Sequence, residues 1–74
     1  MEERVKAIMA DILLIEGSAI NDQSSMDTIE RWDSLAQIDV ITALEEEFGV
    51  TFEVEEFQTM TSFSDIIDIL SEKV

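Results

Sequence analysis

Ser34 is the residue whose type and sequence neighbours best suit a covalent modification. It is the middle residue of Asp33-Ser34-Leu35, and Asp followed by Ser is typical of the start of a helix. A phosphate ester on the Ser34 hydroxyl would lie where the N–H groups of the first helical turn and the helix dipole favour negative charge. Leu35 and Ile38 would offer a partner apolar side chains to contact. The simpler alternative is that Asp33 and Ser34 only begin the helix.

Catalytic groups are scarce elsewhere in the chain. With no Cys and no His, the sequence excludes disulfides, iron–sulfur clusters, thiolate or imidazole metal sites, and Ser-His or Cys-His nucleophile pairs. The adjacent carboxylates of Glu45, Glu46 and Glu47 point outward at different angles around one helix. A solvated acidic face is therefore a better interpretation than an acid–base pair. We expect no catalytic residue and no enzymatic activity.

A dedicated metal site is not expected either. Residues 21–28 are rich in oxygen ligands, but they lack the Asp, Gly and Glu spacing of a calcium-binding EF-hand loop. What remains is diffuse, weak binding of divalent cations to the acidic surface.

The charge of the chain restricts its partners and its location. The 74 residues include 18 Asp and Glu against 4 Lys and Arg, which gives a formal net charge of -14. Such a surface repels phosphate backbones and anionic lipids, so we expect neither nucleic acid nor a membrane as partner. The longest apolar runs, such as residues 12–15, are too short to span a membrane, and the N-terminus lacks the basic region of a signal peptide. We expect a cytoplasmic protein with one domain, residues 1–74.

Hydrophobic periodicity predicts the elements that position Ser34. The fold expected is an all-α bundle of three longer helices and a short third one, with a long loop after the first helix. The first helix is predicted over residues 2–16, with Gly17 as its left-handed C-terminal cap. Its periodic apolar residues are Val5, Ile8, Ile12 and Ile15. The loop over residues 17–33 has four apolar side chains that can hold it against the core: Ile20, Met26, Ile29 and Trp32.

The second helix is predicted to begin after the cap Asp33 and to end at Phe48, with Gly49 as its stop. On a helical wheel, the face toward the core holds Val40, Ile41, Leu44 and Phe48. The opposite face begins apolar and ends acidic. It holds Leu35, Asp39, Thr42 and Glu46, with Ile38 and Glu45 on its flank.

Two further helices complete the bundle. Residues 53–60 predict a short helix or a single 3₁₀ turn. The last helix begins at a capping-box pattern, Ser62 to Asp65. Its apolar face is expected to hold Phe63, Ile66, Ile67, Leu70 and Val74.

Over essentially its whole length the chain resembles acyl carrier proteins. The most specific stretch is Trp32-Asp33-Ser34-Leu35, then Ile38-Asp39-Val40-Ile41, then Ala43-Leu44-Glu45-Glu46-Glu47-Phe48-Gly49-Val50. The resemblance implies a 4′-phosphopantetheine arm on Ser34, transferred from coenzyme A by a holo-carrier synthase, a phosphopantetheinyl transferase that uses magnesium. The terminal thiol of that arm carries an acyl group as a thioester, so the absence of Cys is no obstacle.

The resemblance also implies a docking surface on the second helix and the short helix for acyl-transferring and biosynthetic enzymes with basic patches. Carried over to this chain, its residues are Asp33, Leu35, Ile38, Asp39, Thr42, Glu45, Glu46, Glu53 and Glu56. From Asp33 to Glu56 there are eight acidic residues and no Lys or Arg. Such a field speeds encounter and orients the partner while each contact stays weak. Carriers of this kind are usually monomers.

A third implication is that the acyl chain can be sheltered between the second and third helices. The candidates for lining such a pocket are Val40, Ile41, Leu44, Phe48, Phe52, Phe57, Met60 and Ile66. The alternative for each is that it only fills the core. Phe57 stands where fatty-acid carriers usually have a smaller residue, which predicts a smaller cavity and a short or polar cargo.

The chain departs from the pattern of carriers in primary fatty-acid synthesis. Those carriers tend to have L-G-A-D-S-L around the attachment serine, whereas this chain has Glu30-Arg31-Trp32-Asp33-Ser34-Leu35, and no Pro precedes the short helix. The W-D-S-L form resembles carriers of specialised lipid, polyketide, polysaccharide or aminoacyl pathways, although Trp32 is better explained as an anchor of the loop. Three functions stay open: an acyl carrier, an aminoacyl or peptidyl carrier, and an unmodified acidic interaction module.

The excess of negative charge predicts a salt-dependent stability. Like charges in so small a bundle repel one another and destabilise the compact state. Raising the ionic strength from about 0.01 M to about 0.15 M shortens the Debye length from about 30 Å to about 8 Å. We therefore expect a higher melting temperature by circular dichroism, and the same effect from millimolar magnesium chloride. An unchanged or lower midpoint would mean that the charges are already compensated within the fold.

Overall fold

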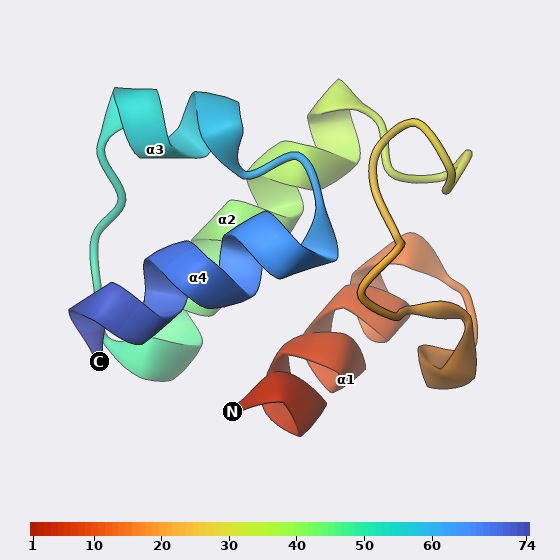
Figure 1. Cartoon of the computed structure of the whole chain (residues 1–74), viewed down its shortest axis with the longest axis horizontal. Helices are drawn as coiled ribbons and strands as arrows, with labels where there is room; N and C mark the ends of the chain where they lie inside the picture. The colour runs from red at the N-terminus through yellow and green to blue at the C-terminus, as the bar shows by residue number, and fades with distance from the viewer.

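The computed structural model describes all residues, 1–74, and contains four α-helices and one 3₁₀ turn (Figure 1). The elements are α1 (Glu2–Leu13), η1 (Gly17–Ala19), α2 (Ser34–Phe48), α3 (Val54–Thr59) and α4 (Phe63–Lys73). The predicted all-α bundle, with its short third helix and long first loop, is confirmed. None of the helices is long and apolar enough to cross a membrane.

The end of α1 differs from the prediction. The helix ends at Leu13, and Leu14 takes the left-handed conformation with φ 58°. The N–H groups of Leu14 and Ile15 both donate to the carbonyl of Ala10 and close the helix. The prediction that Gly17 caps the helix is wrong, because Gly17 begins η1 instead. An earlier end leaves Leu14 exposed and packs Ile15 against the core, and this burial offsets the strain of a non-glycine residue at positive φ.

The core is a single cluster built from α1, the long loop, α2, α4 and Met60, the residue that follows α3. The side of α1 that faces it is centred on Val5, Met9 and Leu13, whereas Ile8 and Ile12 are half-buried at its edge. Twelve side chains form the cluster: Val5, Met9, Leu13, Ile20, Trp32, Val40, Ile41, Leu44, Met60, Phe63, Ile66 and Leu70. So small a core stabilises the fold only modestly.

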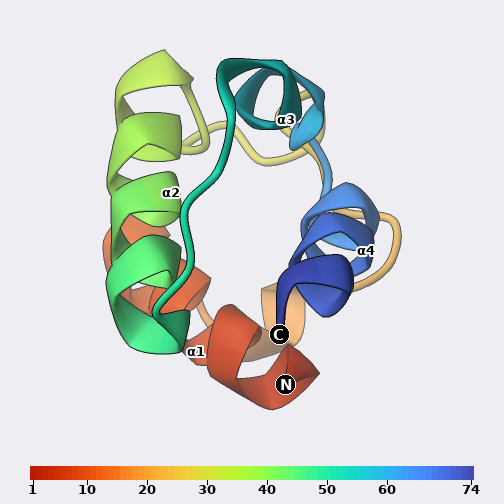
Figure 2. The same cartoon turned by 90° about the vertical axis from the view of Figure 1, so that its left-hand side faces the viewer.

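Both ends of α2 form as the sequence predicts. The Asp33 carboxylate caps the helix by accepting the N–H of Ala36 at 2.9 Å, and Gly49 ends it with φ 65°. Val40, Ile41 and Leu44 are buried, and Phe48 is half-buried against the core. Figure 2 shows the chain after α2 returning along that helix, so that α3 lies near the end where α2 begins.

The loop between α1 and α2 is held at both of its ends and in its middle. Ile20 and Trp32 are buried, and Met26 and Ile29 pack against the core, as predicted. In the middle, the Met26 N–H donates to the Thr61 carbonyl at 2.9 Å, and the Phe63 N–H donates to the Ser24 carbonyl at 3.0 Å. This short antiparallel bridge joins the loop to the α3–α4 connection, next to the start of α2.

Gln37 is a buried polar residue that the helical-wheel analysis missed. Its Oε1 accepts the indole N–H of Trp32 at 2.6 Å, and its Nε2 donates to the carbonyl of Met60 at 2.7 Å. The only sequence signal for its burial is its position one turn before Val40 and Ile41 on the core face of α2. The pair of bonds connects the loop, α2 and the end of α3.

The remaining helix starts are capped by side chains. At α3, the Glu56 carboxylate accepts the N–H of Glu53 at 2.8 Å. At α4, the hydroxyl of Ser62 accepts the N–H of Asp65 at 3.1 Å, as the capping-box pattern predicts. Val74, expected on the apolar face of the last helix, follows the end of α4 and is exposed, because no segment packs over the chain end there.

We predict that Gln37→Leu strongly destabilises the fold. The substitution leaves the Trp32 indole N–H and the Met60 carbonyl buried without partners. Each of the two orphaned groups costs about 1–3 kcal/mol, so the free energy of unfolding in urea should fall by about 2–6 kcal/mol. Gln58→Leu, at an exposed position of α3, is the control and should stay within about 0.5 kcal/mol of wild type. If the free energy of unfolding fell equally in the two variants, the buried Gln37 amide would not be the source of the stabilisation.

Candidate functional site

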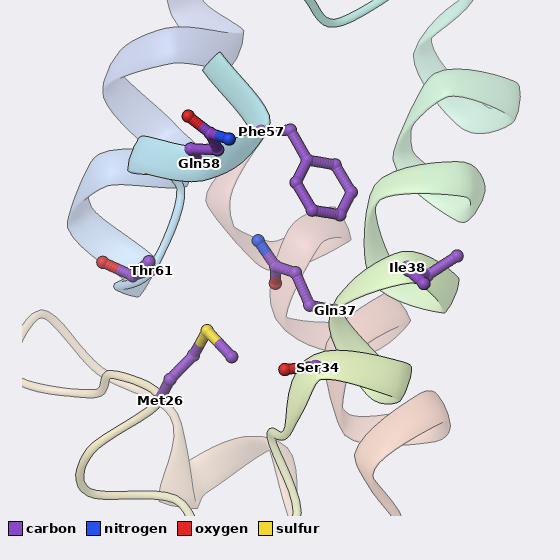
Figure 3. A pocket seen from close by; sticks show the side chains of 7 residues that line it. All are labelled: Met26, Ser34, Gln37, Ile38, Phe57, Gln58 and Thr61. Atoms are coloured by element: carbon purple, nitrogen blue, oxygen red, sulfur yellow. The ribbon is translucent and has the colours of Figure 1, made fainter. Parts of the chain in front are cut away.

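Ser34 is the first residue of α2, and its side chain is exposed. Its hydroxyl faces an open cavity of about 280 Å³ between α2, α3 and the long loop (Figure 3). The cavity is lined by Met26, Ser34, Gln37, Ile38, Phe57, Gln58 and Thr61. The hydroxyl is thus accessible to a modifying enzyme and adjoins a space where an attached group can lie.

The backbone at the start of α2 suits an anionic ester on Ser34. Asp33 uses its carboxylate for the N–H of Ala36 and its carbonyl for the N–H of Gln37 at 2.9 Å. The N–H groups of Ser34 and Leu35 have no partner in the protein. Free N–H groups and the positive end of the helix dipole stabilise a phosphate group at this position. The residues present therefore fit a phosphodiester on the Ser34 oxygen.

The predicted docking residues form an acidic surface with an apolar centre beside Ser34. Leu35 is 75% exposed and Ile38 is 50% exposed, and because they are three residues apart on one helix they offer neighbouring apolar surface. Five further predicted residues are also exposed, namely Asp33, Asp39, Thr42, Glu46 and Glu53. We call these seven residues the α2–α3 surface. It can receive a partner that presents basic groups around an apolar patch.

Glu45 and Glu56, the other two predicted docking residues, are half-buried and already have partners. The Glu45 carboxylate accepts the N–H of Phe52 at 2.9 Å and holds the connection that leads to α3. Glu56 forms an ion pair with Lys73 of α4 at 2.9 Å. In the structure both carboxylates stabilise the position of α3, in addition to any contact with a partner.

Known proteins match this chain over almost its whole length. A protein-family model described as a phosphopantetheine attachment site matches residues 3–70. An acyl carrier protein of Thermosynechococcus vestitus is 38% identical over 72 residues, which cover 97% of this chain and 89% of that protein. An acyl carrier protein of Petrotoga mobilis is 37% identical over 73 residues, covering 97% of this chain and 85% of that protein. The chain belongs to the acyl carrier protein family.

The fold of this carrier is shared with solved structures. The solution NMR structure of the holo acyl carrier protein from Geobacter metallireducens superposes with a TM-score of 0.86. It is 22% identical, and the match covers 97% of this chain and 83% of that one. At this level of identity, the likeness concerns the fold alone.

Membership of the family confirms several predictions made from the sequence. Acyl carrier proteins are carriers and not catalysts, and they bear a covalent 4′-phosphopantetheine group. They interact with a phosphopantetheinyl transferase and with biosynthetic enzymes. The predicted carrier class, its prosthetic group and its lack of enzymatic activity are therefore established for this chain.

The eight residues predicted to line an acyl pocket occupy different positions in the structure. Five of them are core side chains that line no cavity: Val40, Ile41, Leu44, Met60 and Ile66. Phe48 and Phe52 are half-buried against the core. Only Phe57 lines the cavity beside Ser34 (Figure 3). Ile38 and Gln37, the first predicted for docking and the second not predicted at all, line it as well.

Glu56 is the titratable group whose environment changes its acidity most clearly. The N–H of Glu53 and the ammonium group of Lys73 both stabilise the carboxylate, so the pKa of Glu56 lies below its ordinary value of 4.5. Lys73 also lies 5.6 Å from the centre of the Phe52 ring. This cluster joins α3 and the connection before it to the last residue of α4.

We predict a pH-dependent effect of Glu56→Gln. A lowered pKa in the folded state means that the carboxylate stabilises the fold fully above its unfolded-state pKa, and this contribution is lost as the pH falls through the folded-state pKa. Glu56→Gln should therefore lower the melting temperature near neutral pH, and the difference from wild type should shrink below about pH 4. Glu55→Gln removes the same charge from an exposed neighbour without an ion pair and is the control. A difference that persists in acid, or an equal effect of Glu55→Gln, would be inconsistent with this role.

Proposed function

We propose that this protein carries acyl intermediates on a 4′-phosphopantetheine arm attached to Ser34 and presents them to biosynthetic enzymes at the α2–α3 surface. The observation that supports the attachment site best is the exposed Ser34 hydroxyl, which faces a cavity at the start of α2 beside two free N–H groups. No other serine of the chain combines a first-turn position in a long helix with such a cavity.

Each part of the site has a task in this proposal. The N–H groups of Ser34 and Leu35 hold the phosphate oxygens of the modified serine, while the bound arm supplies a thiol that forms thioesters. The carboxylates of the α2–α3 surface attract a basic partner and orient it toward Ser34. Leu35 and Ile38 then provide a small apolar contact. Since the contact is small, the partner is released quickly after transfer.

The protein is proposed to act as one carrier domain and as a monomer in the cytoplasm. The absence of Cys fits a reducing compartment. For the pathway, the W-D-S-L sequence favours specialised acyl transfer over primary fatty-acid synthesis. Aminoacyl transfer is the second candidate, because the same motif occurs in carriers of that kind.

The attachment site can be tested by mass spectrometry. We expect the intact mass of the chain to increase by one phosphopantetheine after incubation with coenzyme A, magnesium and a broad-specificity phosphopantetheinyl transferase. Fragmentation should place the adduct on Ser34, and Ser34→Ala should remain unmodified while it keeps the wild-type circular dichroism spectrum. Ser64→Ala changes an exposed serine in the first turn of α4 and is the matched control, which should be modified like wild type.

Two results would argue against the proposal. An adduct on another serine, or on Ser34→Ala, would move the attachment site. No adduct on a folded chain with more than one transferase would favour an unmodified acidic interaction module.

A further inference from the structure

A second open groove, of about 430 Å³, lies between α1 and α2. We call it the α1–α2 groove. It is lined by Ile8, Asp11, Ile12, Ala43, Glu46 and Glu47. Figure 1 shows α1 and α3 on different sides of α2, and the groove shares no residue with the cavity beside Ser34. A protein bound in the groove would therefore leave that cavity open.

The half-buried residues of the α1–α2 groove form an apolar floor. Ile8 and Ile12 are one turn apart on α1, so their side chains lie on the same face of that helix. The apolar contribution of α2 is only the methyl group of Ala43. So small a side chain leaves a space between the two helices that the fold does not fill. The floor can receive aliphatic surface from a partner.

The rim of the α1–α2 groove carries carboxylates from both helices. Glu47 of α2 is already paired with Arg4 of α1. Asp11 of α1 and Glu46 of α2 are exposed and form no ion pair. Two free negative charges, one from each helix, therefore line the same groove as the apolar floor.

This combination of floor and rim matches an arginine side chain. The aliphatic stem of Arg can lie on apolar surface while its charged end stays near water. Its planar guanidinium group has five N–H donors and can bond to two carboxylates at once. The ammonium group of Lys is a compact point charge and suits two separate acceptors less well. Shape and charge together therefore favour Arg.

A second copy of the chain is a poor occupant of the groove. Each copy has a net charge of -14, so two copies repel one another. Among the cations, Arg4 and Lys73 already form ion pairs. Lys6 lies 5.7 Å from the centre of an aromatic ring, which leaves only Arg31 to contact another copy. A partner protein with a basic surface is attracted instead.

We propose that the α1–α2 groove is a second interaction surface, which binds an arginine side chain carried on an apolar segment of a partner protein. The stem of the Arg and its apolar neighbours contact Ile8, Ile12 and Ala43. The guanidinium group pairs with Asp11 and Glu46. Because Glu46 also belongs to the α2–α3 surface, the two surfaces adjoin along α2. The inference does not depend on where the arm is attached, so the unmodified chain can be tested.

The test is an NMR titration of the isotope-labelled full chain with a synthetic peptide. The peptide is helical, about 15 residues long, and carries one Arg with a Leu four positions away and no other charge. A matched peptide has citrulline, which is neutral and similar in shape, in place of Arg. We expect the Arg peptide to shift the backbone N–H resonances of Ile8 and Ile12, and the citrulline peptide to leave them unchanged.

Two variants and their controls locate the binding. Asp11→Asn removes one free carboxylate and should weaken binding in the groove by about threefold to tenfold. Asp68→Asn makes the same change at an exposed position of α4 outside the groove and should bind like wild type. Ala43→Leu fills the groove without a change of charge and should abolish the shifts. Ala7→Leu, at an exposed position of α1 outside the groove, should not.

Four results would overturn the proposal. Shifts confined to the α2–α3 surface would mean that the groove binds nothing. Equal shifts with the citrulline peptide would mean that the charge is not recognised, and so would equal affinities of Asp11→Asn and wild type. Groove shifts that grow with the concentration of the chain alone would identify a second copy as the occupant. If Ala43→Leu does not fold by circular dichroism, the comparison of Asp11→Asn with Asp68→Asn decides.

Discussion

The side-chain amide of Gln37 accepts the indole N–H of Trp32 and donates to the Met60 carbonyl, and these two bonds join the long loop, α2 and the end of α3. They form away from water, where a lost partner is not replaced, so the three segments hold one another in a single arrangement. Ser34 lies one turn before Gln37 on the same helix. The cavity beside Ser34 and the position of α3 across from it both depend on this bridge.

The negative charge of the carrier's α2–α3 surface is not neutralised by ion pairs within the fold. Of the four cations, Arg4 pairs with Glu47, Lys73 pairs with Glu56, and Lys6 lies 5.7 Å from the ring centre of Phe63. Arg31, the fourth, forms no ion pair, and no ion pair involves a carboxylate of the α2–α3 surface. A field of one sign attracts basic partners at the cost of repulsion within the fold, which a core of twelve side chains must offset.

Some elements of the fold could be predicted from the sequence and others could not, and the difference has a physical cause. Both ends of α2 were predictable, because an Asp cap and a glycine stop act through bonds within a few residues. The exposure of Leu35 and Ile38 followed from helical periodicity alone. The end of α1 was not predictable by the same rules. Gly17 is the better local stop, but packing of Ile15 on the core favours an end at Leu14.

By itself the sequence determined the class of protein, the helix that begins at Ser34 and the sign of the surface around it, because each depends on residue types and short spacings. Only the tertiary structure decided which side chains line the cavity. Phe57 reaches it, most of the other candidates fill the core, and Gln37 also lines it. The reason is distance along the chain. The Met60 carbonyl that accepts from Gln37 is 23 residues away, and no local pattern specifies such a partner.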